Sequence, residues 1–284
     1  MILIRNCEGF DELEACVRMQ TETWGYDVSD VIPRKAYKVA QKIGGQVMGA
    51  FDTELAGAGD LDGPQSGPES MVGFLMALPG VKSVDGLASP YLHSHMLAVK
   101  SEYRNRGIGV QLKLAQRREA LERGIRLIEW TFDPLEIKNA WLNIVKLGAV
   151  VSNYLADFYG VSSSRLQGGL PTDRLVAEWH LDSPRVAAAL AGLSLASYRI
   201  DEEIKVPRSI YEWKSTEAGR AMALAVQSEN RHRFQQAFSR GLAVLGFSRD
   251  EEGNGRFELG SASQEPAWPS QPEWTSDSEE NKNQ

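Results

Sequence analysis

The residues best suited to bind an anion form an Arg-x-x-Gly-x-Gly motif that spans Arg104 to Gly109. The motif follows an alternating, strand-like stretch from Tyr91 to Val99 and precedes a helical pattern that runs from about Gly107 to Arg123. At such a turn, successive backbone N–H groups and the helix N-terminus attract an anion, and glycine leaves room for phosphate oxygens. Two arginines add charge. The motif therefore predicts a diphosphate site, with a purely structural tight turn as the alternative.

Two other phosphate-binding loops fit this segment less well. A Rossmann loop needs a third glycine, but Val110-Gln111-Leu112 follows Gly107-Ile108-Gly109. A Walker loop is excluded because the chain contains no Gly-Lys-Ser/Thr. A nicotinamide-dependent dehydrogenase is therefore a distant alternative, and NADH binding would be its test.

Two histidines on the preceding strand are candidate bases. In a regular strand one face carries His93, His95, Leu97 and Val99, and the other carries Leu92, Ser94, Met96 and Ala98. A neutral imidazole near pH 7 can accept a proton from an amine. Hydrogen-bonded histidines of the core are the alternative interpretation.

The remaining patterns predict a chain of alternating strands and helices. Strands are expected at 2–5, 46–51, 71–78, 91–99, 126–132, 149–154 and 175–180, and helices at 10–23, 33–43, 107–123 and 133–147. Asp133-Pro134-Leu135-Glu136 has the residue types of a helix start. Residues 53–70 predict a long hairpin loop. Further along we expect a helix at 183–190, an extended segment at 196–207, a long helix at 216–245 and a strand at 256–259.

Composition argues against several classes of protein. The net charge of −7 is unlike that of a nucleic-acid binder. Two cysteines cannot form a disulfide framework, and four histidines without a Cys/His cluster predict no metal site. No apolar run reaches the ~18 residues of a membrane span. The first charged residue, Arg5, follows only four apolar residues, which is unlike a signal peptide. We expect a soluble, cytoplasmic protein without nucleic-acid or membrane partners.

The order strand, Arg104–Gly109 loop, helix, strand, helix resembles motifs A and B of the GNAT superfamily of acyltransferases. The resemblance covers residues 1–160 and is most specific over 91–150. It implies an α/β (α+β) fold whose mixed, largely antiparallel sheet is splayed between its fourth and fifth strands and flanked by helices. We expect an acyl-CoA-binding core at 1–160, a C-terminal α+β extension at 161–260 that completes the acceptor side, and a disordered acidic tail at 261–284.

The resemblance also implies contacts with coenzyme A. Backbone amides of the loop would hold the pyrophosphate, which assigns Arg104, Asn105, Arg106, Gly107, Ile108 and Gly109. The end of the preceding strand would pair with the pantetheine arm and, at a bulge, polarise the thioester oxygen, which assigns Leu97, Ala98 and Val99. Asn139 matches an asparagine that commonly contacts the same arm.

The family pattern bears on the catalytic groups as well. Many members have a glutamate 14 residues before the first loop glycine, where this chain has His93. Many carry a tyrosine acid four residues before the glycine that ends motif B, where this chain has Ile144. The usual acid is therefore in doubt. We take His93, His95 and Tyr159 as candidate catalytic residues, and Arg174 as a candidate for binding a substrate carboxylate.

A closer resemblance is to a GNAT branch of which some members are encoded beside N-acylamino-acid racemases. Its residues are His93-Ser-His95-Met-Leu-Ala-Val, Trp130-Thr-Phe-Asp-Pro-Leu135, Lys146-Leu-Gly-Ala, Tyr159-Gly and Gly169-Leu-Pro-Thr-Asp-Arg174. The branch implies N-succinyl transfer to amino acids.

We therefore expect an enzyme that moves an acetyl or succinyl group from acetyl-CoA or succinyl-CoA, its cosubstrate, to the amine of a small molecule, with no permanently bound cofactor. A non-catalytic acyl-CoA-binding module and a protein acetyltransferase are the alternatives. A homodimer is one option for assembly.

Overall fold

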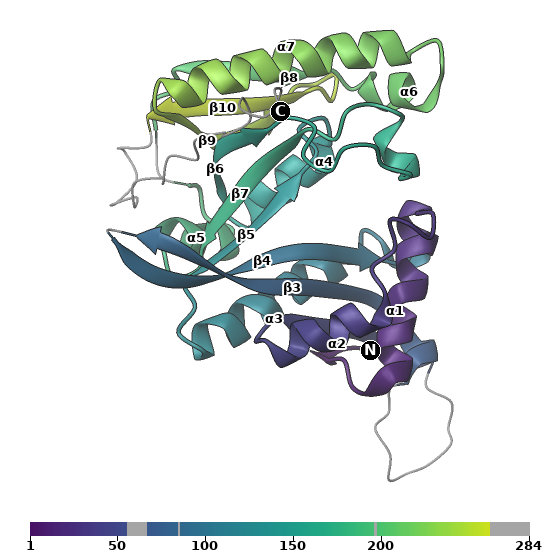
Figure 1. The fold of residues 1–284 in the computed structure, drawn as a ribbon. Coiled ribbons are helices and arrows are strands. Elements are labelled where there is room, and N and C mark those ends of the chain that lie inside the picture. Colours follow the sequence, from purple (N-terminus) through teal and green to yellow (C-terminus); the bar gives the residue numbers. More distant parts are fainter. Residues whose placement is uncertain (56–66, 85, 196–197, 262–284) are drawn as a thin grey trace, which may run out of the picture.

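A computed structural model describes residues 1–55, 67–84, 86–195 and 198–261. Within these ranges the strands form a ten-stranded sheet with the order β1-β2-β3-β4-β5-β7-β6-β9-β10-β8 (Figure 1). All neighbouring strands are antiparallel except β4 and β5, which are parallel. The predicted mixed, largely antiparallel sheet is confirmed. Most of the predicted 53–70 loop and the acidic tail lie outside the described residues.

The bounds of the elements are as follows. The strands are β1 (Ile2–Asn6), β2 (Gln46–Asp52), β3 (Met71–Val84), β4 (Leu87–Val99), β5 (Leu127–Phe132), β6 (Val150–Leu155), β7 (Arg174–His180), β8 (Glu202–Val206), β9 (Leu242–Arg249) and β10 (Gly255–Ser261). The α-helices are α1 (Gly9–Trp24), α2 (Arg34–Lys42), α3 (Ile108–Glu122), α4 (Ile137–Ala140), α5 (Pro184–Leu190), α6 (Ile210–Ser215) and α7 (Arg220–Ser239). Short 3-10 turns are η1 (Pro68–Ser70), η2 (Ser101–Tyr103) and η4 (Arg165–Gln167), and η3 (Trp141–Lys146) is a π-helix.

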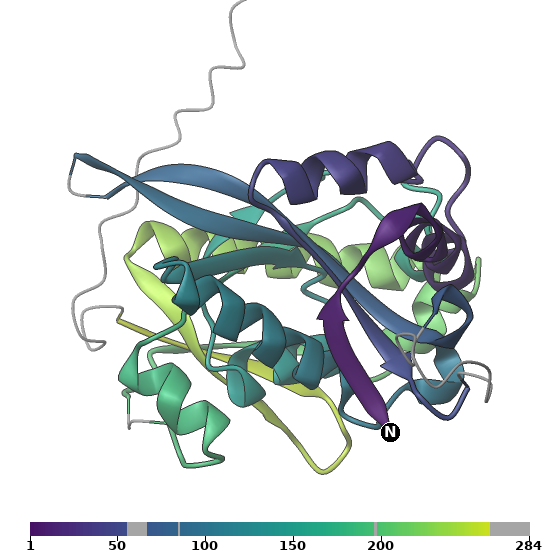
Figure 2. The ribbon, with the colours of Figure 1, turned by 90° about the horizontal axis from the view of Figure 1, so that it is seen from below.

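Helices cover both faces of the N-terminal half of the sheet. Leu13 of α1 and Tyr37 of α2 pack in one apolar cluster with Phe74 of β3. Ile108 and Leu112 of α3 pack in another cluster, on the opposite face. Figure 2 shows β3 and β4 passing between α2 and α3. In the C-terminal half, α7 lies along β8, β9 and β10 (Figure 1).

β3 and β4 form a hairpin that is longer than the sequence predicts. Two prolines, Pro79 and Pro90, lie inside it. Pairing with β2 ends at Ala77, and pairing with β5 begins at Leu92, so each proline lies where its strand has one unpaired side. Such a position tolerates a residue without a backbone N–H.

The predicted helix start at Asp133 is wrong. Asp133 accepts hydrogen bonds from the backbone N–H groups of Leu135 (2.8 Å) and Glu136 (3.1 Å), which makes a turn, and α4 begins at Ile137. The Asp133 and Glu136 carboxylates accept from Lys214 Nζ at 2.8 and 3.0 Å. The two acids are therefore used in a tertiary ion pair instead of a helix cap.

The long helix predicted at 216–245 is wrong at its C-terminal end. It stops at Ser239, and Leu242–Arg249 forms β9. Gly241 has a φ of 79° and donates its N–H to the carbonyl of Phe238 at 2.9 Å. Glycine takes this left-handed conformation without strain, which ends a helix. The predicted strand at 256–259 is confirmed as part of β10.

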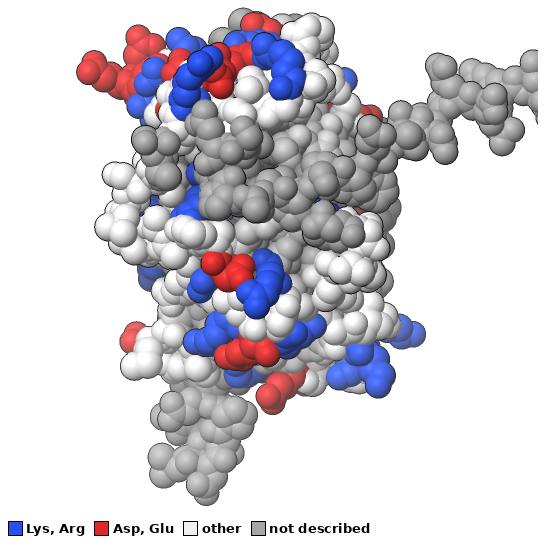
Figure 3. Space-filling model, turned by 90° about the vertical axis from the view of Figure 1, so that its left-hand side faces the viewer, with Lys and Arg blue, Asp and Glu red and all other residues white. Residues whose placement is uncertain are grey.

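The division into a core at 1–160 and an extension at 161–260 stays a prediction. β7 belongs to the second range but pairs between β5 and β6. Within the described ranges, no helix has the length and hydrophobicity of a membrane span. Basic and acidic side chains lie side by side on the face seen in Figure 3.

Candidate active site

β4 and β5 separate shortly after their first contact. They pair only at Leu92 with Ile128 and His93 with Glu129. Beyond these pairs β4 continues to Val99, and no strand of the described residues pairs with it on its β5 side, because β5 diverges (Figure 1). The predicted splay between the fourth and fifth strands is therefore confirmed. It leaves backbone N–H and C=O groups of β4 available to a ligand along this edge.

A β-bulge lies at His95. In the pairing of β3 with β4, Met76 faces Met96 and Ala77 faces Ser94, so His95 is the extra residue. The bulge was predicted around Leu97 to Val99, and that position is wrong. A bulge redirects the side chains on either side of it and is common next to active sites.

The bulge reverses the alternation of side chains along β4. Before it, Ser94 faces α3, and its hydroxyl accepts a hydrogen bond from Lys113 Nζ at 2.9 Å. After it, Leu97 packs against the α3 cluster, whereas Met96 accepts a hydrogen bond from the Tyr37 hydroxyl of α2 at 3.6 Å. A strand shifted by one residue exchanges its two faces.

His93 and His95 consequently lie on the α2 side of the sheet, with ring centroids 6.1 Å apart. The prediction that they share a face with Leu97 and Val99 is wrong, because both of those residues pack on the α3 side. Leu97 and Val99 therefore lie on the opposite face of the strand from His93 and His95, whereas Ala98 lies on the same face as the histidines.

The β6–β7 connection brings further predicted residues to His95. The ring of Tyr159 lies 6.2 Å from that of His95, measured between centroids. A 2.9 Å hydrogen bond joins the hydroxyls of Tyr159 and Thr131, and the Arg174 guanidinium lies 5.3 Å from the Tyr159 ring centroid. The structure thus gathers the predicted His93, His95, Tyr159 and Arg174 on one face.

The electrostatics of the two histidines differ. Burial, together with the nearby His93, lowers the pKa of His95 below its ordinary value, so its imidazole is neutral at pH 7. His93 Nδ1 lies 3.5 Å from a carboxylate oxygen of Glu129. Lys82, from the β3–β4 hairpin, pairs with Glu129 and lies 3.4 Å from Glu178.

This row of charges was not predicted from the sequence. Glu129 and Glu178 are adjacent partners on β5 and β7, and burial raises the pKa of the second. The sequence did contain a hint of Glu129, because this acidic residue interrupts the hydrophobic run Leu-Ile-Glu-Trp-Thr-Phe. Lys82 carried no such signal because its hairpin position depends on long-range pairing.

The Arg104–Gly109 loop ends at the N-terminus of α3. Asn105 and Gly107 are left-handed, with φ values of 62° and 77°, and α3 begins at Ile108. A Cβ on Gly109 would meet only a Leu97 methyl, at 3.5 Å, so protein atoms leave the space in front of the turn open. Arg104 Nε donates to the Val99 carbonyl at 3.2 Å.

The other residues of interest are either exposed or buried. Arg106 is exposed and lies over the Tyr103 ring, 4.9 Å from its centroid. Asn139 is exposed on α4. Ile144 is fully buried, and the buried Tyr154 donates to Asp173 at 2.5 Å. Tyr159, at 42% exposure, is therefore far more accessible than Tyr154, at 7%.

Comparison with known proteins gives the class. Residues 52–139 match the family model described as acetyltransferase (GNAT) family. This segment contains β3, β4, the glycine loop, α3 and β5. The fold is the GNAT fold, and the match to the family model is confined to residues 52–139. No curated protein matches the sequence.

Solved structures with a similar arrangement include three acetyltransferases. NAA60 of Arabidopsis thaliana, in complex with acetyl-CoA, is 15% identical over 63% of this chain and 99% of its own, with a TM-score of 0.48. The ribosomal-protein-S18-alanine N-acetyltransferase of Escherichia coli is 14% identical over 64% and 94%, with a TM-score of 0.46. Aminoglycoside 6′-acetyltransferase type Ii is 16% identical over 63% and 97%, with a TM-score of 0.45.

Proposed function

We propose that the protein is an enzyme that transfers an acyl group from a coenzyme A thioester to the amine of a small molecule. One observation carries the proposal: the anion-binding loop and His95 lie at the two ends of the same splayed strand segment. From Val99 to His95 this segment spans about 13 Å at the usual rise per residue. A ligand anchored at the loop and extended along β4 would therefore end beside the bulge.

The loop and strand suit the two ends of coenzyme A. The pyrophosphate would lie on the N–H groups of Gly107, Ile108 and Gly109 at the start of α3. The amide groups of the pantetheine arm would pair with Leu97 to Val99, as an added strand does. Asn139 would contact the same arm. The unpaired side of β4 supports this arrangement.

The reaction is direct attack on the thioester. The amine nitrogen forms a bond to the carbonyl carbon, the C–S bond breaks, and its electron pair leaves on sulfur. His95, neutral at pH 7, takes the proton from the attacking amine. A backbone N–H at the bulge polarises the oxygen. Tyr159, held by Thr131, returns a proton to the thiolate, which replaces the acid missing at Ile144.

Two further assignments follow the same geometry. Arg174 lies above the Tyr159 ring and donates to the Asp173 carbonyl and to Gln167 Oε1; it would also bind a carboxylate where the acceptor carries one. Acetyl is the default acyl group and succinyl the alternative. The C-terminal extension supplies Arg174 and so helps to complete the acceptor side.

Calorimetric titration with acetyl-CoA, succinyl-CoA and free coenzyme A tests the donor site. We expect binding by the wild type and at least tenfold weaker binding by Gly109→Trp, because the indole fills the space in front of the loop. Leu114→Trp is the control, since it introduces the same indole at an exposed position of α3. If none of the three ligands binds the wild type, the proposal is wrong. Binding without turnover of any amine would instead support an acyl-CoA-binding module.

A further inference from the structure

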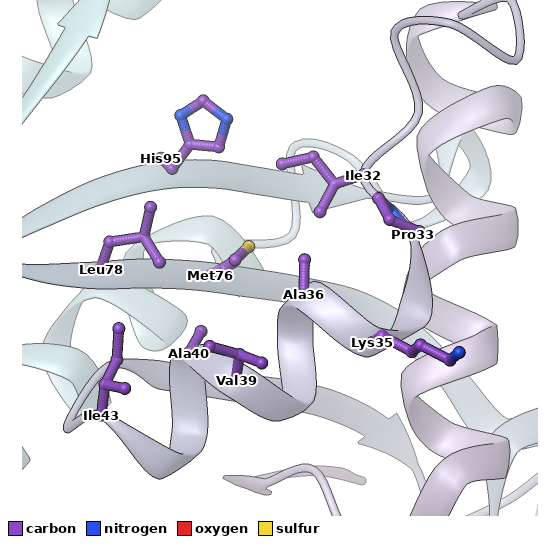
Figure 4. A pocket seen from close by; sticks show the side chains of 10 residues that line it. All are labelled: Ile32, Pro33, Lys35, Ala36, Val39, Ala40, Ile43, Met76, Leu78 and His95. Atoms are coloured by element: carbon purple, nitrogen blue, oxygen red, sulfur yellow. The ribbon is translucent and has the colours of Figure 1, made fainter.

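A groove of about 540 Å³ lies between α2 and the strands β3 and β4 (Figure 4). Aliphatic side chains form its walls, among them Ala36 and Val39 of α2 and Met76 and Leu78 of β3. His95 lies at its edge (Figure 4). The groove therefore adjoins the candidate base directly.

The apolar character of this groove calls for an explanation. Val39 and Ile43, both on the same side of α2, are each 56% exposed. Leaving such side chains in water forfeits about 25 cal/mol for each Å² that a ligand would cover. The volume also falls in the range of roughly 300–1,000 Å³ that is typical of small-molecule sites. These properties suit an apolar ligand group.

The polar groups around the groove restrict the ligand further. Tyr159 and Arg174 lie beyond His95, whereas the Lys35 side chain points away from the groove (Figure 4). An amine that delivers its proton to His95 can extend its substituent into the groove. A second positive charge on that substituent would meet aliphatic walls without a counter-ion, which disfavours diamines and polyamines.

We infer that the acceptor is a primary amine with an apolar, aliphatic or aromatic, substituent, and that this substituent occupies the groove between α2 and β3. The inference rests on the proposed acyl transfer, because it takes His95 as the base. It assigns the acceptor side a chemical class, which neither the glycine loop nor the splayed strands define.

Acylation of a matched set of amines tests the inference with the wild-type protein. The set is n-propylamine, n-pentylamine and 1,5-diaminopentane, each with acetyl-CoA. A hydrophobic pocket gains roughly tenfold in kcat/KM for each added methylene that it buries. We expect kcat/KM for pentylamine to exceed the values for both other amines by at least tenfold. Equal values for pentylamine and diaminopentane would overturn the inference.

A pair of variants locates the effect. Ala36 is half-buried at the groove, and Ala36→Phe would fill the space. We expect it to reduce kcat/KM for pentylamine at least tenfold and to leave the value for propylamine within about twofold. Lys38→Phe adds the same ring to an exposed position of the same helix and should change neither. An equal loss for both amines in Ala36→Phe would contradict the groove as the subsite.

A direct binding measurement separates this inference from the proposed function. Pentylamine should shift the NMR signals of the Ala36, Ile43 and Met76 methyl groups, and 1,5-diaminopentane should not. These shifts in a protein that acylates no amine would leave the groove assignment standing and remove the transferase. Turnover of amines without these shifts would support the transferase and overturn the groove assignment. Sedimentation showing a dimer that Ala36→Phe dissociates would reassign the groove to a second copy of the chain.

Discussion

At the scale of single residues, Lys113 is the most unusual charge in the described part of the chain. Its Nζ donates to Ser94 Oγ at 2.9 Å and to Gln116 Oε1 at 3.1 Å, and it lies 3.8 Å from the Trp130 ring centroid. No carboxylate pairs with it among the described residues. Burial lowers its pKa to about 7. At pH values below about 7 the folded protein therefore contains a buried, charged Lys113 ammonium that is less well solvated than it would be in water.

Lys113→Met should stabilise the protein at low pH. The folded pKa of about 7 lies below the ordinary lysine value of 10.5, so the unfolded state binds more protons between these values. The free energy of unfolding of the wild type therefore rises with pH above 7, and the cost of the buried charge is fully present below 7. We expect the advantage of the methionine variant to shrink by about 2 kcal/mol between pH 7 and pH 9.

Urea unfolding of both proteins at several pH values measures this change. Lys38→Met, at an exposed position of α2, is the control and should show no comparable pH dependence. A difference between wild type and Lys113→Met that stays constant from pH 6 to pH 9 would mean that the lysine does not titrate in this window.

At the scale of elements, local signals were predictable and long-range ones were not. The glycine loop, α3 and the strand before it follow from periodicity and from Gly107 and Gly109. The bulge at His95 depends on pairing with β3, which the alternation along β4 does not contain. The types of the candidate site residues could therefore be predicted from the sequence, but the faces of the sheet on which they lie could not. Similarly, the partner of Asp133 is Lys214, which lies far along the chain.

One ion pair links α7 to the connection that carries Tyr159. Asp173 is fully buried and accepts hydrogen bonds from Arg231 Nε at 2.8 Å and Nη2 at 2.7 Å. It also accepts from the Tyr154 hydroxyl and, at 3.0 Å, from the backbone N–H of Asp157. The carboxylate thus holds both ends of the β6–β7 connection against the helix.

Arg231→Gln should loosen this connection. The change leaves a buried carboxylate without its cation, which costs about 1–3 kcal/mol of stability when the partner is partly exposed. Acyl transfer should fall as well, because Tyr159 and Arg174 lose their support. Thermal unfolding and kcat/KM measure the two effects. Arg233→Gln, which removes a more exposed pair with Glu202 on the same helix, should change both much less. Equal effects of the two variants would show that the link to Asp173 has no special role.

At the scale of the whole molecule, the largest apolar cluster joins both halves of the sheet. It contains Trp130 and Leu175 from the splayed region and Phe257 and Leu259 from β10. Phe234 of α7 connects them: its ring is stacked on Tyr154 at 5.7 Å and lies edge-on to Phe257 at 5.2 Å. A core shared in this way couples the unfolding of residues 161–260 to that of residues 1–160.

Phe234→Ala should therefore destabilise the whole protein in a single step. Phe234 is fully buried, and removing such a ring costs about 3–5 kcal/mol through lost burial and the cavity left behind. Scanning calorimetry should give one transition for the wild type, shifted to lower temperature in the variant without splitting. Met222→Ala, on the exposed side of α7, should leave the transition almost unchanged. Two transitions, of which only one responds to Phe234→Ala, would instead show that residues 161–260 unfold as a separate unit despite the shared cluster.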